Sequence, residues 1–182
     1  MTGDAHGSAR ILGRLGSEGG TGVVRMEDRF DAGIEDVWSA LTDPSRLSRW
    51  YGEVEGDLRP AGEYRARVFA TGSDISGRVE ACEPPARLRV TVRETDESWR
   101  EGQGAPPFDE RTEVTLTADG DQTVLVIEVR GMPVGLLFAY GTGWQIHVED
   151  LGAHLAGRGR GDAAARWPEL QPAYEALAAN IG

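Results

Sequence analysis

The residues best suited to chemistry lie near the carboxyl end of the chain. His147, Asp150 and His154 follow one another as H-x-x-D-x-x-x-H. Positions three apart are neighbours on a helix surface, so Asp150 could orient His147 for general acid–base chemistry. The two histidines are seven residues apart, about 10 Å along a helix axis, and no metal site is predicted. We favour the interpretation that both histidines flank an apolar helix face and have no catalytic role.

Other motifs carry weaker signals. Cys82 has no histidine close to it in sequence, and burial is its expected role. The stretch GTGWQI, residues 141–146, lacks the last glycine of a dinucleotide-binding loop, so no cofactor is predicted. Glu53, Glu55 and Asp57 alternate along a strand and are expected to face solvent rather than hold a cation.

Composition limits the partners. The net charge of −11 disfavours nucleic acid and anionic membrane surfaces. All 19 basic residues are arginines, which excludes Schiff-base and P-loop lysines. One cysteine allows no internal disulfide, and the N-terminus does not resemble a signal peptide. Together with the absence of a long apolar run, these features predict a cytoplasmic protein without membrane insertion, either a monomer or a homodimer.

Period-two alternation of apolar and polar residues predicts most of the elements. Strands are expected over residues 10–15, 23–30, 62–70, 75–83, 87–94 and 111–130, the last range being a hairpin that turns at 118–121. The glycine-rich residues 16–22 are expected to form a turn. Strict alternation indicates an antiparallel sheet with one solvated face and one covered face.

Helical spacing interrupts the strands early in the chain and replaces them near its end. Residues 34–41 predict one helix, and Asp43 followed by Pro44 predicts the cap and first turn of a second. In the long helix expected over residues 135–156, an apolar stripe around Trp144 includes Val148. One long helix held by a curved antiparallel sheet is the helix-grip arrangement, an α+β fold.

The tail of the chain carries a further apolar stripe. Trp167, Leu170 and Tyr174 are expected to cover Ile146 on the back of the long helix. A proline at position 172 predicts a turn over residues 168–171 before the helix begins. The expected divisions are therefore a disordered segment at 1–9, one domain at 10–157, a loop at 158–166 and a docked C-terminal helix at 167–182.

The motif F…I…VW.ALTDP..L..WYG…G.L…GEYR, followed by GW…HVEDL, resembles the START-like SRPBCC superfamily. More narrowly, it is similar to the bacterial branch named after the activator of heat-shock-protein-90 ATPase. The similarity covers about residues 23–156. It implies a deep, mostly apolar cavity between sheet and helix that holds lipids, polyketides or other hydrophobic molecules.

On that resemblance, aromatic side chains and inward strand positions are expected to line the cavity. Valine is frequent at these positions, which favours open space over a tightly packed core. The expected lining residues are Trp38, Trp50, Tyr64, Ala66, Val68, Val90, Val92, Trp99, Val114, Leu116, Ile127, Val129, Phe138, Tyr140, Gly141, Trp144 and Val148. The long connection at 95–111 is either a lid or a solvated hairpin tip.

Three functions follow from these observations. Binding of a hydrophobic small molecule is the first prediction. A cyclase or hydrolase using His147 and Asp150 in the same cavity is the second, and it would make ligand affinity or turnover change between about pH 5 and 8. A module that modulates a chaperone ATPase is the third, and it would require a broad exposed apolar patch.

Overall fold

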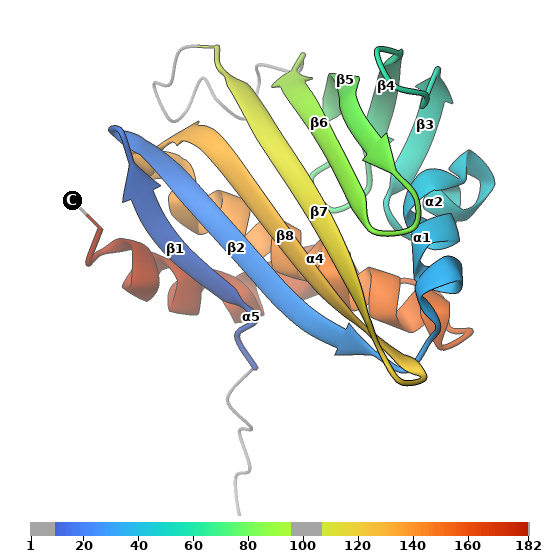
Figure 1. Ribbon diagram of the computed structural model, residues 1–182. Coiled ribbons are helices and arrows are strands. Elements are labelled where there is room, and N and C mark those ends of the chain that lie inside the picture. Colours follow the sequence, from blue (N-terminus) through green and yellow to red (C-terminus); the bar gives the residue numbers. More distant parts are fainter. Residues whose placement is uncertain (1–9, 96–106, 182) are drawn as a thin grey trace, which may run out of the picture.

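The computed structural model describes residues 10–95 and 107–181. Within them, eight strands form one antiparallel sheet in the order β1-β2-β8-β7-β6-β5-β4-β3 (Figure 1). The strands are β1 (Gly13–Glu18), β2 (Thr21–Phe30), β3 (Gly52–Gly56), β4 (Glu63–Val68), β5 (Asp74–Glu83), β6 (Arg87–Glu94), β7 (Asp109–Asp119) and β8 (Gln122–Pro133). The predicted segment 1–9, most of the predicted 95–111 loop with Trp99, and residue 182 lie outside the described residues.

The first hairpin differs from the expected one. Residues 16–22 were expected to form the turn, but β1 continues through Glu18 and the turn is only Gly19–Gly20. Both glycines have positive φ, at 59° and 86°, as a two-residue type I′ turn requires. Because glycine adopts this conformation without a steric penalty, the strands pair closely on both sides of the turn.

Two short helices close one end of the sheet, at the right of Figure 1. They are α1 (Ile34–Thr42) and α2 (Pro44–Trp50). The predicted cap is confirmed: Asp43 Oδ1 accepts a hydrogen bond from the Ser45 amide at 2.9 Å. Trp50 Nε1 donates to the Ala40 carbonyl at 3.0 Å, which fixes α2 against α1.

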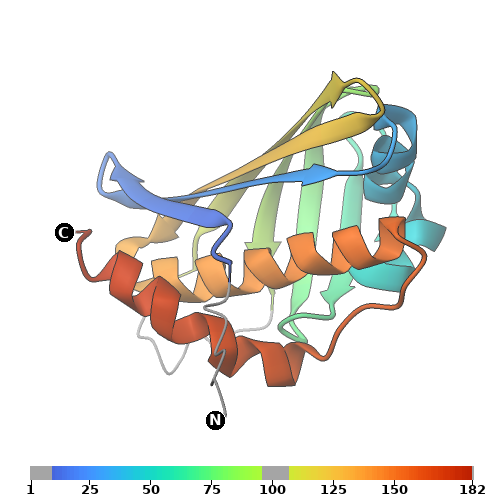
Figure 2. The ribbon, with the colours of Figure 1, turned by 90° about the horizontal axis from the view of Figure 1, so that it is seen from below.

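The long helix α4 (Leu137–Leu155) crosses the concave face of the sheet, as Figure 2 shows. It follows a 3₁₀ turn, η1 (Val134–Leu136), so the α-helix begins two residues later than expected. Val148 and Leu151 are buried between helix and sheet. The predicted helix-grip fold is confirmed.

The tail forms one helix, α5 (Ala163–Ala178), and the predicted turn at 168–171 is wrong. Asp162 Oδ1 caps it through the Ala165 amide, and Pro168 and Pro172 both lie inside it. A proline inside a helix costs about 3 kcal/mol. The complete burial of Leu170 and Tyr174 against the rest of the protein offsets this cost, so tertiary packing outweighs the local signal.

Helix α5 lies along the side of α4 that faces away from the sheet (Figure 2). The predicted burial of Ile146 on this side is confirmed, since Ile146 is almost fully buried. Gly141, expected in the cavity, lies on this side too: a Cβ atom there would stand 2.4 Å from the Tyr174 ring. The absent side chain therefore gives room to Tyr174 of α5, not to a ligand.

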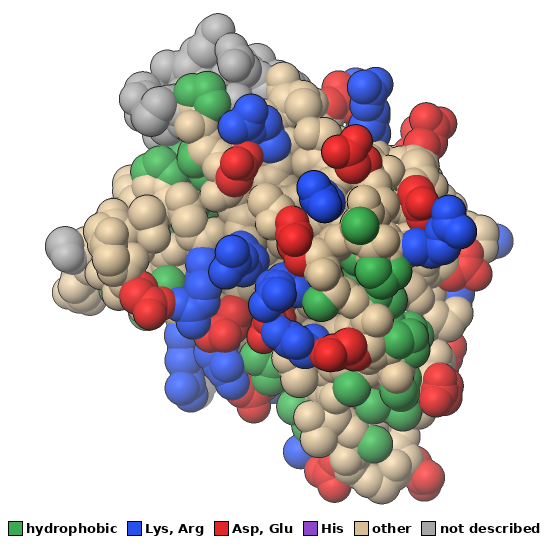
Figure 3. Space-filling model, turned by 45° about the horizontal axis from the view of Figure 1, so that its top comes forward, with side chains coloured by type: hydrophobic (Ala, Val, Ile, Leu, Met, Phe, Trp, Pro, Cys, Tyr) green, Lys and Arg blue, Asp and Glu red, His purple; other side chains and the backbone are tan. Residues whose placement is uncertain are grey.

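The outer face of the sheet is solvated and charged. Arg87 pairs with Glu113 at 2.9 Å and Arg93 with Asp109 at 2.9 Å. In Figure 3 basic and acidic side chains alternate over the surface. Such exposed pairs contribute roughly 0–1 kcal/mol each. Within residues 10–95 and 107–181, no helix combines the length and apolar character needed to cross a bilayer.

Candidate functional site

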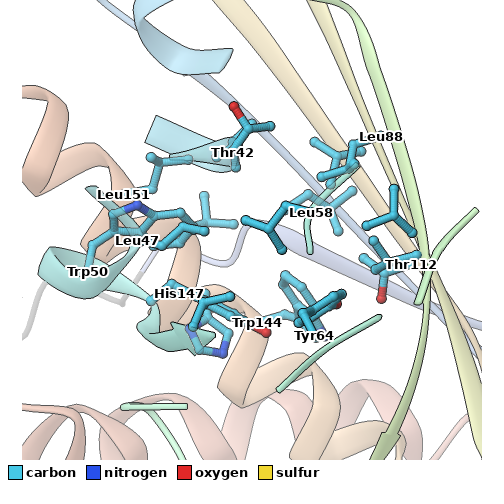
Figure 4. A pocket seen from close by; sticks show the side chains of 18 residues that line it. Thr42, Leu47, Trp50, Leu58, Tyr64, Leu88, Thr112, Trp144, His147 and Leu151 are labelled. Carbon is cyan, nitrogen blue, oxygen red and sulfur yellow. The ribbon is translucent and has the colours of Figure 1, made fainter. Parts of the chain in front are cut away.

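A small apolar pocket of about 100 Å³ lies between the sheet and the helices (Figure 4). Strand register builds its floor, because Val90 lies opposite both Val79 and Thr112, and Val114 lies opposite both Leu88 and Ile127. Helices α1, α2 and α4, together with β3, β4 and the loop between these two strands, supply the other walls. The remaining lining residues are Leu41, Thr42, Leu47, Trp50, Tyr51, Val54, Leu58, Tyr64, Trp144, His147, Val148 and Leu151.

Tyr64 of β4 enters this pocket because its cross-strand neighbour is Gly77. A Cβ atom at Gly77 would lie 2.3 Å from the Tyr64 ring. The glycine thus lets the ring lie across the sheet surface, where it forms part of the pocket wall.

A second, large pocket of about 720 Å³ adjoins the small one. It is bounded by the β4–β5 turn, the ends of β6 and β7, and the amino-terminal parts of α4 and α5. Tyr51, Trp144 and His147 line both pockets. The His147 ring centroid is 4.9 Å from that of Tyr51 and 5.3 Å from that of Trp144, so these three rings form the boundary between the two spaces. We call them the aromatic boundary.

The structure divides the predicted lining residues into three groups. Seven line the small pocket: Trp50, Tyr64, Val90, Val114, Ile127, Trp144 and Val148. Val68, Phe138 and Tyr140 line the large pocket. The others among the described residues, Trp38, Ala66, Val92, Leu116 and Val129, are buried in the packed core, and Gly141 faces α5.

Sequence reasoning missed the polar residues of the site. Glu110 lines the large pocket and Thr112 the small one. On β7, Glu110 lies four residues and Thr112 two residues before Val114, so all three side chains point to the inner face of the sheet. That period-two register was the available signal: it places a glutamate on the covered face of the sheet.

Three buried polar atoms of the pockets have no hydrogen-bond partner among the described residues: Glu110 Oε2, Thr112 Oγ1 and His147 Nδ1. Their residues are only 7%, 3% and 6% exposed. Buried polar groups in proteins are nearly always hydrogen-bonded, and an unsatisfied one costs about 1–3 kcal/mol. These atoms are therefore suited to bind polar groups of a ligand.

Burial determines the protonation of the Glu110 carboxyl group. Desolvation raises its pKa to about 8, a hydrogen bond with Tyr140 opposes this rise, and the charge of Glu94 adds to it. At pH 7 the carboxyl group is therefore mostly protonated and neutral. Burial also raises the pKa values of the Tyr51 and Tyr64 hydroxyls, so both stay protonated.

The predicted pair of His147 and Asp150 is not assembled. Asp150 Oδ1 accepts a hydrogen bond from the Gly161 amide at 2.8 Å, on the α5 side of α4, whereas His147 faces the pockets. Burial lowers the pKa of His147 to about 4, so this imidazole stays neutral across the range in which the pair was expected to titrate. His154 Nε2 accepts a hydrogen bond from Arg46 Nε at 3.1 Å, away from both pockets.

A curved sheet that grips one long helix over internal pockets defines a helix-grip protein. The chain belongs to the family described as Activator of Hsp90 ATPase homolog 1-like protein, whose family model matches residues 31–156. The resemblance stated from the sequence is thereby confirmed. No curated protein matches the chain.

Solved structures share the fold. The crystal structure of CalU16 from Micromonospora echinospora is 29% identical, with 92% of this chain and 98% of that chain covered and a TM-score of 0.72. Protein CV1439 from Chromobacterium violaceum is 26% identical, with coverages of 73% and 96% and a TM-score of 0.58. DynU16, a protein of the dynemicin biosynthetic locus, is 23% identical, with coverages of 78% and 50% and a TM-score of 0.65.

Proposed function

We propose that this protein binds a hydrophobic small molecule between the sheet and α4. The observation that carries the proposal is the small pocket, whose walls are almost entirely apolar and which adjoins a larger space across the aromatic boundary. The apolar end of the ligand lies in the small pocket, and the rest extends past Trp144 and His147 into the large one.

The sizes of the two pockets fit this arrangement. A cavity of about 150 Å³ lined by apolar side chains holds a benzene molecule, so about 100 Å³ suits a group smaller than benzene, such as a short branched chain. The large pocket, at about 720 Å³, lies within the range of about 300–1,000 Å³ that is typical of small-molecule sites. Affinity then comes mainly from the removal of apolar surface from water, at about 25 cal/mol per Å².

The other two predicted functions receive less support. The acid–base pair that a cyclase or hydrolase would need is not formed, because Asp150 accepts a hydrogen bond from the Gly161 amide while His147 faces the pockets. A chaperone-directed module would need a broad apolar surface, and among the described residues Leu177 is the single large hydrophobic side chain that is exposed.

Filling the small pocket tests the proposal. Val90→Trp places an indole in the pocket, whereas Thr91→Trp places the same group on the outer face of the same strand. Nile red, a neutral apolar dye, is titrated into the wild type and both variants, and its fluorescence is followed. We expect saturable binding by the wild type and Thr91→Trp, and a loss of at least about tenfold in affinity for Val90→Trp, because the indole occupies the space that the dye needs.

Thermal melting shows whether a loss of dye binding is caused by unfolding of the variant. A true void accepts the indole with little strain, so Val90→Trp should melt within a few degrees of the wild type. A variant that unfolds, together with a wild type that does not bind the dye, would show that the space is packed core and would refute the proposal.

A further inference from the structure

The large pocket has walls of an unusual composition. Six aromatic residues line it: Tyr51, Phe69, Phe138, Tyr140, Trp144 and Trp167. The two carboxylic acids of Glu94 and Glu110 line it as well, but no arginine among the described residues does, and the whole chain has no lysine. Aromatic faces and carboxylates both attract cations and repel anions.

One of these rings is already in contact with a cation. Arg160, in the connection between α4 and α5, holds its guanidinium carbon 4.1 Å from the centroid of the Phe69 ring. The Arg160 guanidinium therefore occupies this face of the Phe69 ring, which shows that an aromatic face at the pocket wall attracts a cation.

Glu110 is one of the buried polar residues of this pocket. Its side chain is nine-tenths buried, and Oε2 has no partner among the described residues. The groups around it come from several elements: Tyr140 and His147 from α4, Glu94 from β6, Tyr64 from β4, and Tyr51 at the end of α2. Among these neighbours none is a cation, since the His147 imidazole is neutral at pH 7.

We propose that the large pocket holds the protonated amine of an otherwise apolar ligand, with Glu110 as its counter-ion. This inference rests on the proposed function and adds the chemical class of the ligand. The apolar body extends through the aromatic boundary into the small pocket, and the ammonium group lies among the aromatic rings beside Glu110 Oε2.

Binding of an amine at this site must release a proton. The carboxyl group of the free protein is protonated at neutral pH, because its pKa is about 8. When an alkylammonium ion enters, the carboxyl proton leaves to the buffer and a carboxylate–ammonium pair remains. The affinity for the amine should therefore rise with pH, about tenfold between pH 6 and 7 and less steeply above that, and level off above pH 8.

Three probes of one shape test this: 4-tert-butylbenzylamine, 4-tert-butylbenzyl alcohol and 4-tert-butylbenzoate, whose branched end matches the small pocket. Their affinities are measured by calorimetry at pH 6, 7 and 8 in two buffers of different ionisation enthalpy, which gives the protons released. For the wild type at pH 8 we expect the amine to bind about tenfold tighter than the alcohol, and the carboxylate to bind weakest. Amine binding at pH 6–7 should release about one proton, and alcohol binding none.

Glu110→Gln should remove the pH dependence and reduce the affinity for the amine to that of the alcohol, while the affinity for the alcohol stays within about twofold. Proton release by the wild type needs no variant, so the inference stays testable if Glu110→Gln folds poorly. An alcohol that binds as well as the amine at pH 8, or amine binding without proton release, would overturn the inference but leave the proposed function standing. If none of the three probes binds, both are overturned.

Discussion

Replacement of Tyr174 by alanine is expected to lower the free energy of unfolding by about 3–5 kcal/mol and Tm by roughly 10 °C. The Tyr174 side chain is fully buried where α5 meets α4 and β1. Its hydroxyl group accepts a hydrogen bond from the Gly13 amide at 3.0 Å and donates one to Gln145 Oε1 at 2.5 Å. Alanine leaves a cavity against Gly141 and removes the hydroxyl group that links Gly13 to Gln145.

Two further variants separate packing from hydrogen bonding. Tyr174→Phe keeps the ring and should cost about 1–3 kcal/mol, because the buried Gly13 amide loses its acceptor, whereas Gln145 Oε1 still accepts a hydrogen bond from the Leu12 amide at 3.1 Å. Leu177→Ala alters a side chain of the same helix that is 39% exposed, and it should cost less than about 1 kcal/mol. If Tyr174→Ala melts within 2–3 °C of the wild type, roughly a 1 kcal/mol effect, α5 does not dock on α4 as the structure shows.

Glu110→Gln is expected to make the protein more stable at high pH but not at low pH. The unfolded carboxyl group ionises near its ordinary value of 4.5, whereas in the folded protein its pKa is about 8. Between these values the folded state binds more protons, so the free energy of unfolding falls as pH rises, by at most about 4–5 kcal/mol from this group. Below pH 4.5 both states are protonated, and this difference is absent.

Urea unfolding at pH 5 and pH 8.5 measures the effect. We expect Glu110→Gln to unfold within about 1 kcal/mol of the wild type at pH 5 and to be more stable by at least about 2 kcal/mol at pH 8.5. Glu113→Gln is the matched control, because Glu113 lies on the same strand and forms an ion pair with Arg87 on the outer face. Its effect should stay near 1 kcal/mol or less at both pH values. An equal effect of Glu110→Gln at both pH values would contradict the burial of this carboxyl group.

The sheet and the gripped helix could be predicted from sequence because their signals are local. Alternation along a strand and apolar spacing along α4 can each be recognised within a single segment of the sequence. Asp43 and Pro44 likewise define a helix start by themselves. The path of α5 could not be predicted in the same way: the local rule for Pro172 favours a helix start, whereas the burial of Leu170 and Tyr174 depends on partners far away in sequence.

The pocket could be predicted only in part for a related reason. Alternation tells which residues face inward but not which of them α4 covers. Val90 and Val92 face the same way, yet Val90 lines the small pocket and Val92 packs into the core. The choice depends on the register among β5, β6 and β7 and on where the aromatic boundary lies, and both are set by tertiary contacts.

Methyl NMR during a titration with 4-tert-butylbenzyl alcohol tests the central claim, a binding cavity between the sheet and α4, most directly. Methyl groups of Leu47, Val90 and Leu151 line the small pocket, whereas Leu125 and Leu170 lie in packed core away from it. We expect saturable shifts, with intermolecular contacts to the tert-butyl group, at the three pocket residues and little change at the two core residues. No shift at the pocket methyl groups, or shifts confined to surface residues, would contradict it.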